Sequence, residues 1–193
     1  MERQAVAAGA GCTHAEGRDL ILFVGAPLRA ALVTEWYTGA RKLSSNPMND
    51  TPHSTDDLER AVAERPDDAQ ALVALANAYW LSGHGPDVVG DLASRAIAAD
   101  PANRAGWHLW ALAESDPRQR VVRWQQVSAR FPGDDLARAN VADNAAALAG
   151  AEHDYDALDL AIVTYEQLLA TVEHPQQREA LDTAIRKLKT WRF

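Results

Sequence analysis

The stretch AQALVALANAYWLSG, residues 69–83, decides the fold class of this 193-residue chain. Leu72, Leu75, Ala76 and Tyr79 fall at relative positions 0, 3, 4 and 7, which is one face of an α-helix. Alanine, the strongest helix former, fills many of the other positions. Gly83 then fits a turn that ends the helix. The stretch therefore predicts an amphipathic helix whose small residues let a neighbouring helix approach closely.

The same face recurs twice further along the chain. Three prolines, each preceded by an apolar helical pattern and followed by a new one, lie 35 and 31 residues apart, at Pro66, Pro101 and Pro132. Three equivalent small residues lie 35 residues apart, at Ala76, Ala111 and Ala146. In the same register Leu72 matches Trp107 and Ala142, and Leu75 matches Trp110 and Ala145. This period predicts helix–turn–helix repeats.

The pattern resembles the tetratricopeptide repeat (TPR) family. In the first unit Leu72, Leu75, Ala76 and Tyr79 occupy the places where that family favours a large apolar residue, Leu, a small residue and Tyr. The match is strong in this unit and weaker in the two that follow. The resemblance implies an all-α fold: a right-handed superhelical array of antiparallel helix pairs, or α-solenoid, with a C-terminal capping helix.

The repeat pattern divides the chain into two parts. We expect an N-terminal extension over residues 1–50 and a TPR-like domain over residues 51–193. Within the domain we expect a half-repeat at 54–65, repeats at 67–100, 102–131 and 134–173, and a capping helix at 175–191 that shields the last repeat. Thr55 is the expected N-cap of the first helix, and Trp191 belongs to the apolar face of the last.

Residues 1–47 do not follow the repeat pattern. They carry a net charge of +1, against −9 for residues 48–193. Two interpretations stay open: Met48 is the true translation start, or the segment is a genuine extension with a helix near residues 27–36 that packs on the array or stays mobile. The apolar run at 20–24 does not fit a secretory signal because Glu16 and Asp19 precede it.

Composition narrows the class of partner. A net charge of −8 disfavours binding to nucleic acid or to an anionic membrane surface. The basic residues near the C-terminus fit cations that offset the dipole of a last helix. The single cysteine, Cys12, excludes an intrachain disulfide. We therefore expect no nucleic-acid or membrane partner and a cytoplasmic location, although a periplasmic protein without disulfides would look the same.

No catalytic pattern is present in the sequence. The glycines at 9, 11 and 17 precede no strand–helix signal of a phosphate loop, and the six histidines lack a spacing that would pair them on one helix face. Paired aspartates such as Asp67-Asp68 and Asp134-Asp135 stand at expected helix starts, where carboxylates cap free N–H groups. We expect no catalytic residue, no metal and no cofactor.

The resemblance implies that the first helices of the repeats line a concave groove. Its register gives nine candidate peptide-binding residues: Gln70, Val73, Asn77, Trp80, His108, Leu112, Asn140, Asp143 and Ala147. Asn77 stands where the family often uses asparagine to hold a peptide backbone, and an amide can donate and accept at once. The basic clamp of the chaperone-binding members is missing, because Val73, Asp143 and Ala147 stand in its place. Alternatively, Asn77 is a plain surface residue, and Trp80 and His108 pack against neighbouring helices.

These patterns predict a non-catalytic adaptor or scaffold that binds a peptide or protein in the groove. The alternative is a structural subunit that self-associates through repeat edges or its convex face. Light scattering would separate the two, since a stable oligomer favours the second.

Overall fold

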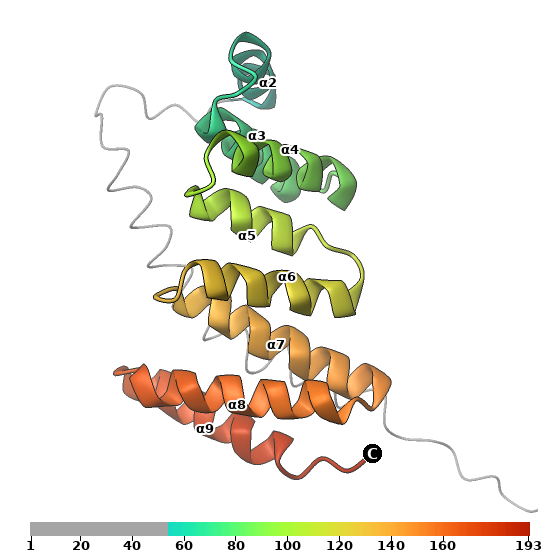
Figure 1. The fold of residues 1–193 in the computed structure, drawn as a ribbon, viewed down its shortest axis with the longest axis vertical. Helices are drawn as coiled ribbons and strands as arrows, with labels where there is room; N and C mark the ends of the chain where they lie inside the picture. The colour runs from blue at the N-terminus through green and yellow to red at the C-terminus, as the bar shows by residue number, and fades with distance from the viewer. Residues whose placement is uncertain (1–53) are drawn as a thin grey trace, which may run out of the picture.

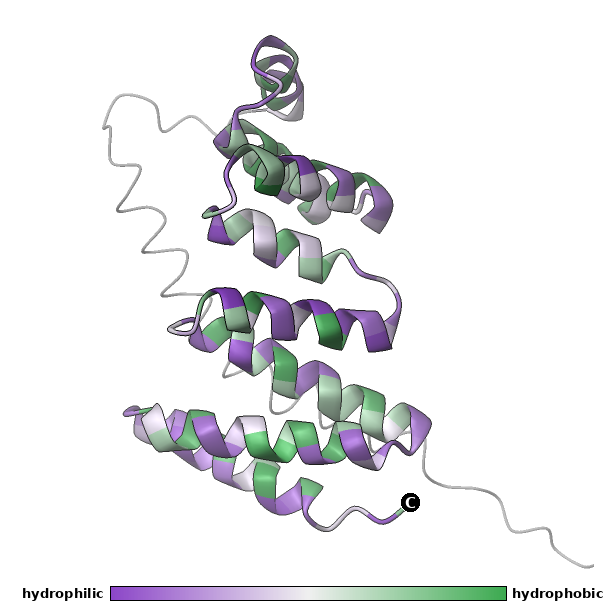
Figure 2. Cartoon of the chain, viewed as in Figure 1, coloured by the Kyte–Doolittle hydropathy of each residue, from purple (hydrophilic) through white to green (hydrophobic). Residues whose placement is uncertain are grey.

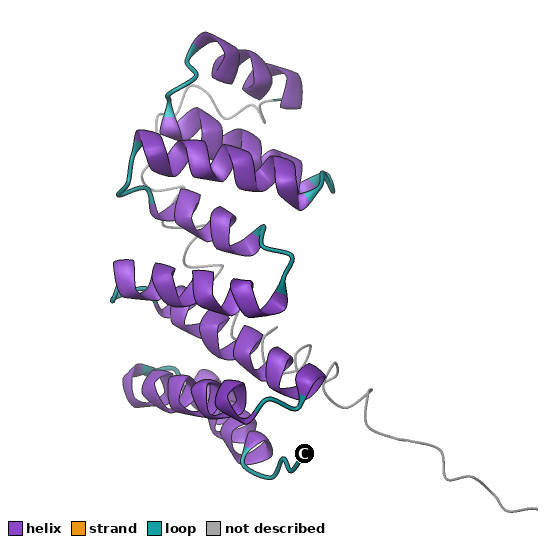
Figure 3. Cartoon of the chain, turned by 45° about the vertical axis from the view of Figure 1, so that its right-hand side comes forward, coloured by secondary structure: helices purple, strands orange, loops and turns teal. Residues whose placement is uncertain are grey.

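A computed structural model of the chain describes residues 54–193, and all regular secondary structure in this range is helical (Figures 1 and 3). The helices are α2 (Thr55–Glu64), α3 (Ala69–Leu81), α4 (Pro86–Ala99), α5 (Arg104–Leu112), α6 (Pro117–Arg130), α7 (Asp135–Glu152), α8 (Tyr155–Thr171) and α9 (Pro175–Leu188). The predicted all-α class is confirmed. The expected extension at 1–50, and with it the question of Met48, lies outside the described residues.

The helices stack in chain order along the long axis of the molecule, from α2 at one end to α9 at the other (Figure 1). Each helix packs on the one before it and the one after it, because the connections are short turns. Beyond these sequential contacts α3 also contacts α5, whereas α4 and α6 make at most a marginal contact. The first helix α3 therefore approaches the next first helix α5 more closely than the second helix α4 approaches α6.

Three apolar clusters form a continuous core along the stack. One joins α2 to α5, the second joins α5, α6 and α7, and the third runs from α6 through α9. Alanines at the repeat register, including Ala76, Ala111 and Ala142, are fully buried, which allows the helix backbones to lie close together. Figure 2 shows both apolar and polar residues along the helices, as expected for elements that bury part of their surface.

Helix starts are held by side-chain caps. The carboxylates of Asp68, Asp134 and Asp154 accept hydrogen bonds from backbone N–H groups of the first turns of α3, α7 and α8. The expected cap of α2 was wrong by one residue: Ser54, not Thr55, is the N-cap. The Ser54 hydroxyl accepts from the Asp57 N–H, and the Asp57 carboxylate accepts from the Ser54 N–H in return. This reciprocal pair is a capping box, and its spacing of three residues fixes the start of α2.

The last helix is shorter than its apolar pattern suggested. α9 ends at Leu188, and Trp191 lies beyond it, although its side chain still packs on the third apolar cluster. The hydroxyl of Thr190 donates to the carbonyl of Lys187 at 2.7 Å, which satisfies one of the free carbonyl groups at the helix end. The apolar contact of Trp191 therefore comes from a turn rather than from the helix itself.

Candidate functional site

The candidate residues of α3 lie on a partly open face. Gln70 is exposed, Val73 and Asn77 are half-buried, and Trp80 is 37% exposed. Leu81, which the sequence register did not include, is 69% exposed directly beside Trp80. The opposite side of α3 is closed, with Leu72 and Ala76 both at 0% exposure. α3 thus presents an aromatic and an aliphatic side chain, with the Asn77 amide about one turn away.

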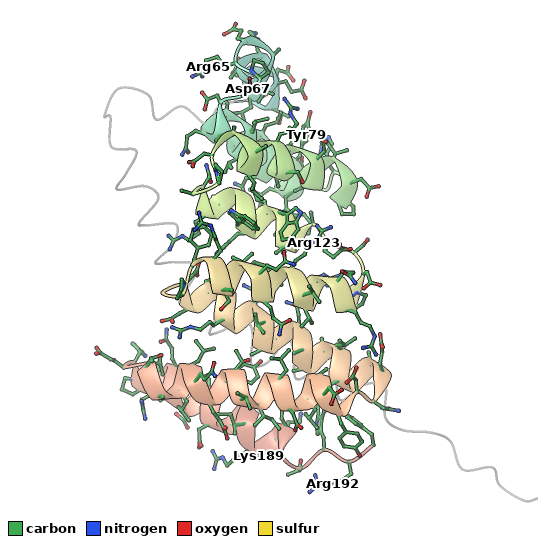
Figure 4. The ribbon with its side chains drawn as sticks, viewed as in Figure 1. Arg65, Asp67, Tyr79, Arg123, Lys189 and Arg192 are labelled. Carbon is green, nitrogen blue, oxygen red and sulfur yellow. The ribbon has the colours of Figure 1, made fainter. Side chains whose placement is uncertain are left out.

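Local contacts at the end of α3 explain why Tyr79 turns inward and Trp80 does not. The Tyr79 hydroxyl donates to the Glu59 carboxylate of α2 at 2.7 Å, and this bond raises the pKa of Tyr79 (Figure 4). His84 stacks on the Tyr79 ring with centroids 4.2 Å apart. Gly83 between them has a φ of +81°, a conformation that disfavours other residues. The turn therefore fixes Tyr79 against α2 and leaves Trp80 and Leu81 at the surface.

The candidate residues of α5 are enclosed. His108 is 8% exposed, and its Nε2 donates to a carboxylate oxygen of Asp134 at 2.7 Å. The ring edge of His108 also meets Trp124 of α6, with centroids 5.4 Å apart. Leu112 is half-buried against the second apolar cluster. His108 therefore links α5 to the start of α7, which fits the packing alternative rather than an open binding position.

Asp134 is the ionised partner in this link. Burial raises the pKa of Asp134, but the hydrogen bond from His108, the electrostatic interactions with His108 and Arg104, and the Ala137 N–H together lower it by more. The Arg104 Nε lies 3.9 Å from the same carboxylate. The pKa of Asp134 therefore lies below its ordinary value, and the carboxylate is charged at neutral pH. Its role as an N-cap was visible in the sequence, but its pairing with His108 was not.

The candidate residues of α7 are also turned into the helix stack. Asn140 is 8% exposed and donates to the Leu136 carbonyl at 2.9 Å. Asp143 is 3% exposed and accepts a hydrogen bond from the Tyr165 hydroxyl of α8 at 2.6 Å. Ala147 is half-buried. Of the nine predicted residues, three are therefore buried, four are half-buried and two are exposed: His108, Asn140 and Asp143; Val73, Asn77, Leu112 and Ala147; and Gln70 and Trp80.

The contacts by which Arg123 of α6 binds α5 were not predicted from the sequence. Arg123 donates to the Trp110 carbonyl at 2.8 Å, and its guanidinium lies 4.5 Å from the centre of the Trp110 ring (Figure 4). The same guanidinium pairs with Glu114 at 2.6 Å. Trp107 and Trp110, expected in the core, are half-buried at this junction, whereas Trp124 is 3% exposed. Arg123 therefore joins α6 to α5 at this junction.

No family model, curated protein or solved structure matches the chain. The candidate site therefore rests on the geometry of residues 54–193. Over this range no three His, Cys, Asp or Glu side chains gather as metal ligands. None of its helices combines the length and the apolar character needed to cross a membrane.

Proposed function

We propose that the chain is a TPR-like superhelical adaptor that binds a peptide or protein on the inner side of its first helices and catalyses no reaction. The contact between α3 and α5, without a matching contact between α4 and α6, supports a stack that curves towards the first helices. Such a curve gives α3 and α5 an inner, concave side. A repeat array of this kind offers a surface rather than a reactive centre.

The exposed Trp80 on α3 is the observation that carries the proposal. Tryptophan is among the residues that most often dominate binding energy at interfaces, and here Leu81 extends its apolar surface. Asn77, half-buried about one turn before Trp80, can donate to and accept from a peptide unit. The net charge of −8 favours a partner with positive charge around an apolar anchor. The ligand we propose is therefore a basic peptide segment with a large apolar side chain.

Selection from a displayed peptide library on the full chain tests this. Selected peptides are then titrated by calorimetry against the parent chain, Trp80→Ala, Asn77→Ala and the control Val122→Ala. Val122 is 41% exposed on the second helix α6, so it matches Trp80 in exposure but not in position. We expect Trp80→Ala to weaken binding by about tenfold or more, which is about 1.4 kcal/mol. If the selected peptides bind the Trp80→Ala and Val122→Ala chains with equal affinity, α3 is not part of the binding site.

A second candidate function is self-association through the second helices. Each of α4, α6 and α8 carries an exposed valine, namely Val88 at 45%, Val122 at 41% and Val163 at 49% exposure. Single exposed apolar residues are common, but one on each outer helix favours a shared contact face. Sedimentation equilibrium tests this alternative. An oligomer of the parent chain that dissociates when all three valines are replaced by serine supports it, and a parent chain that stays monomeric at high concentration refutes it.

A further inference from the structure

The segment that follows α9, residues 189–193, folds back onto the turn between α7 and α8 (Figure 1). The Tyr155 hydroxyl, at the start of α8, accepts from the Phe193 N–H at 2.9 Å and donates to the backbone oxygen of Phe193 at 3.0 Å. The Phe193 ring stacks on the His153 ring, with centroids 5.1 Å apart and planes 26° apart. The rings of Tyr155 and Trp191 lie 5.1 and 5.8 Å from it. Both the backbone and the ring of Phe193 are therefore held at this turn.

His153 has a backbone conformation that glycine normally supplies. It is the C-cap of α7, with a φ of 55° in the left-handed region. Glycine is the usual residue at such helix ends, because a Cβ in this conformation is strained. Within residues 54–193 no other non-glycine residue has a positive φ. A side chain kept at such a position is expected to make a compensating contact, and His153 makes one with the Phe193 ring.

The turn that receives this segment is itself fixed to α6. Arg118, near the start of α6, pairs with Glu152 and lies 2.8 Å from a carboxylate oxygen of Asp154. The two residues that alternate with these carboxylates, His153 and Tyr155, contact the segment after α9. The four-residue turn thus joins α6 through its charged side chains and the segment after α9 through its aromatic ones.

α9 has few attachments besides its apolar face. Among residues 54–193 it packs extensively on α8 alone, through a row of buried apolar side chains. Its N-cap, His174, makes no side-chain cap hydrogen bond, and Arg178 donates instead to two carbonyl groups at the end of α8. Lys189 pairs with Glu166 at 2.7 Å, but both side chains are about half exposed, so this pair contributes little. The start of α9 is therefore fixed by Arg178, and its far end by the segment that follows it.

We propose that His153, Tyr155 and Phe193 form a latch that keeps α9 closed over α8. When the latch releases, α9 opens as a unit about the connection at residues 172–174, because its remaining attachments are local to α8. The opening uncovers apolar residues of α8 that share the third cluster with α9. The latch therefore controls whether this side of the array is covered. It involves no residue of α3, so it is independent of the binding function proposed above.

Hydrogen exchange of the full chain, followed amide by amide by NMR, tests the latch. Phe193→Ala removes the ring contacts, and we expect it to raise the exchange rates across residues 179–188 about tenfold, with α2 and α5 unchanged. Phe193→Tyr keeps the ring and should exchange as the parent chain does. Val163→Ala is the matched control, because Val163 is 49% exposed on α8, as Tyr155 is at 50%, but lies about two turns away from it. This control should leave the exchange of α9 unchanged.

His153→Gly separates a latch from a contact that only adds to overall stability. Glycine relieves the left-handed backbone of the turn while the stacked ring is lost. We therefore expect the exchange of α9 to rise severalfold and that of α7, which reports global unfolding, to change by less.

Three results would overturn the proposal. The first is an α9 that exchanges at the parent rate in Phe193→Ala. The second is a rise confined to residues 186–188, which is fraying of the last turn alone. The third is an equal rise over α7 and α9 in both Phe193→Ala and His153→Gly, which is a loss of overall stability without a separate opening of α9.

Discussion

Replacing Asp134 with alanine removes two hydrogen bonds at once, and the sum of their contributions can be worked out from the structure. One carboxylate oxygen caps α7 by accepting from the Ala137 N–H at 3.1 Å, and loss of such a cap costs about 1 kcal/mol. The other oxygen accepts from His108 at 2.7 Å in a buried setting, and a hydrogen bond to a charged group contributes about 1.5–3 kcal/mol. We therefore expect Asp134→Ala to lower the free energy of unfolding by about 2.5–4 kcal/mol.

Asp116→Ala is the matched control. Asp116 caps α6 by accepting from the Gln119 N–H at 2.8 Å, but it is exposed and bonds no histidine. Its loss should cost about 1 kcal/mol. Urea denaturation followed by circular dichroism at pH 7 gives both values, provided that the slope of the free energy of unfolding against urea concentration is the same in all chains. If Asp134→Ala costs no more than Asp116→Ala, the His108 bond contributes nothing and the assignment of this link is wrong.

The pH dependence adds a second check on the same residue. Because the pKa of Asp134 is lower in the folded chain than its ordinary value, its contribution to stability is present above about pH 4. That contribution is lost as the pH falls through the folded-state pKa. The stability difference between the parent chain and Asp134→Asn should therefore shrink below about pH 4. A difference that stays constant down to pH 2 would contradict the ionised link.

Four further changes have outcomes that thermal and urea denaturation can measure. Gly90→Ala should stabilise the chain by about 0.5–1 kcal/mol, because the Cβ added to α4 would make an ordinary 3.7 Å contact with the Cβ of Ala113. The same change at Gly83 should destabilise it by about 1 kcal/mol, because φ there is +81°. Arg123→Ala should cost about 1.5–3 kcal/mol by removing the hydrogen bond to the Trp110 carbonyl and the ion pair with Glu114. Tyr165→Phe should cost about 1–3 kcal/mol, because it removes a donor from a buried carboxylate of α7.

Helix ends could be predicted because their causes are local. Proline has no N–H and fixes its own backbone, so Pro66, Pro101 and Pro132 mark turns in any context. The capping box at α2 was also local: Ser54 and Asp57 show the required spacing, which Thr55 lacks because the third residue after it is Leu58. The all-α class follows from such signals. The hand and pitch of the proposed superhelix do not, since they depend on how whole helices pack.

The exposure of the inner-face residues could not be predicted from the repeat register. The register places His108 and Asp143 beside Asn77, yet the first two are enclosed and the third is half-open. Each is paired with a residue from another part of the chain, His108 with Asp134 and Asp143 with Tyr165. A single-sequence pattern cannot show which distant side chain reaches an inner position. It does show that a polar group there requires a partner if it is buried.

The core of the third unit explains why its polar residues pair internally. Ala142 and Ala145 stand where the first unit has Leu72 and Leu75, so each position buries about three fewer carbon atoms, at about 0.8 kcal/mol per methylene. Closer helix approach recovers part of this stabilisation. The bond from Tyr165 to Asp143 adds directional contact between α7 and α8 that alanines cannot provide. The buried polar groups of α7 thus contribute to the packing of α7 on α8, whereas Trp80 on α3 is exposed, as the proposed binding function requires. Substitutions on α7 should therefore change stability first, and those at Trp80 should change binding first.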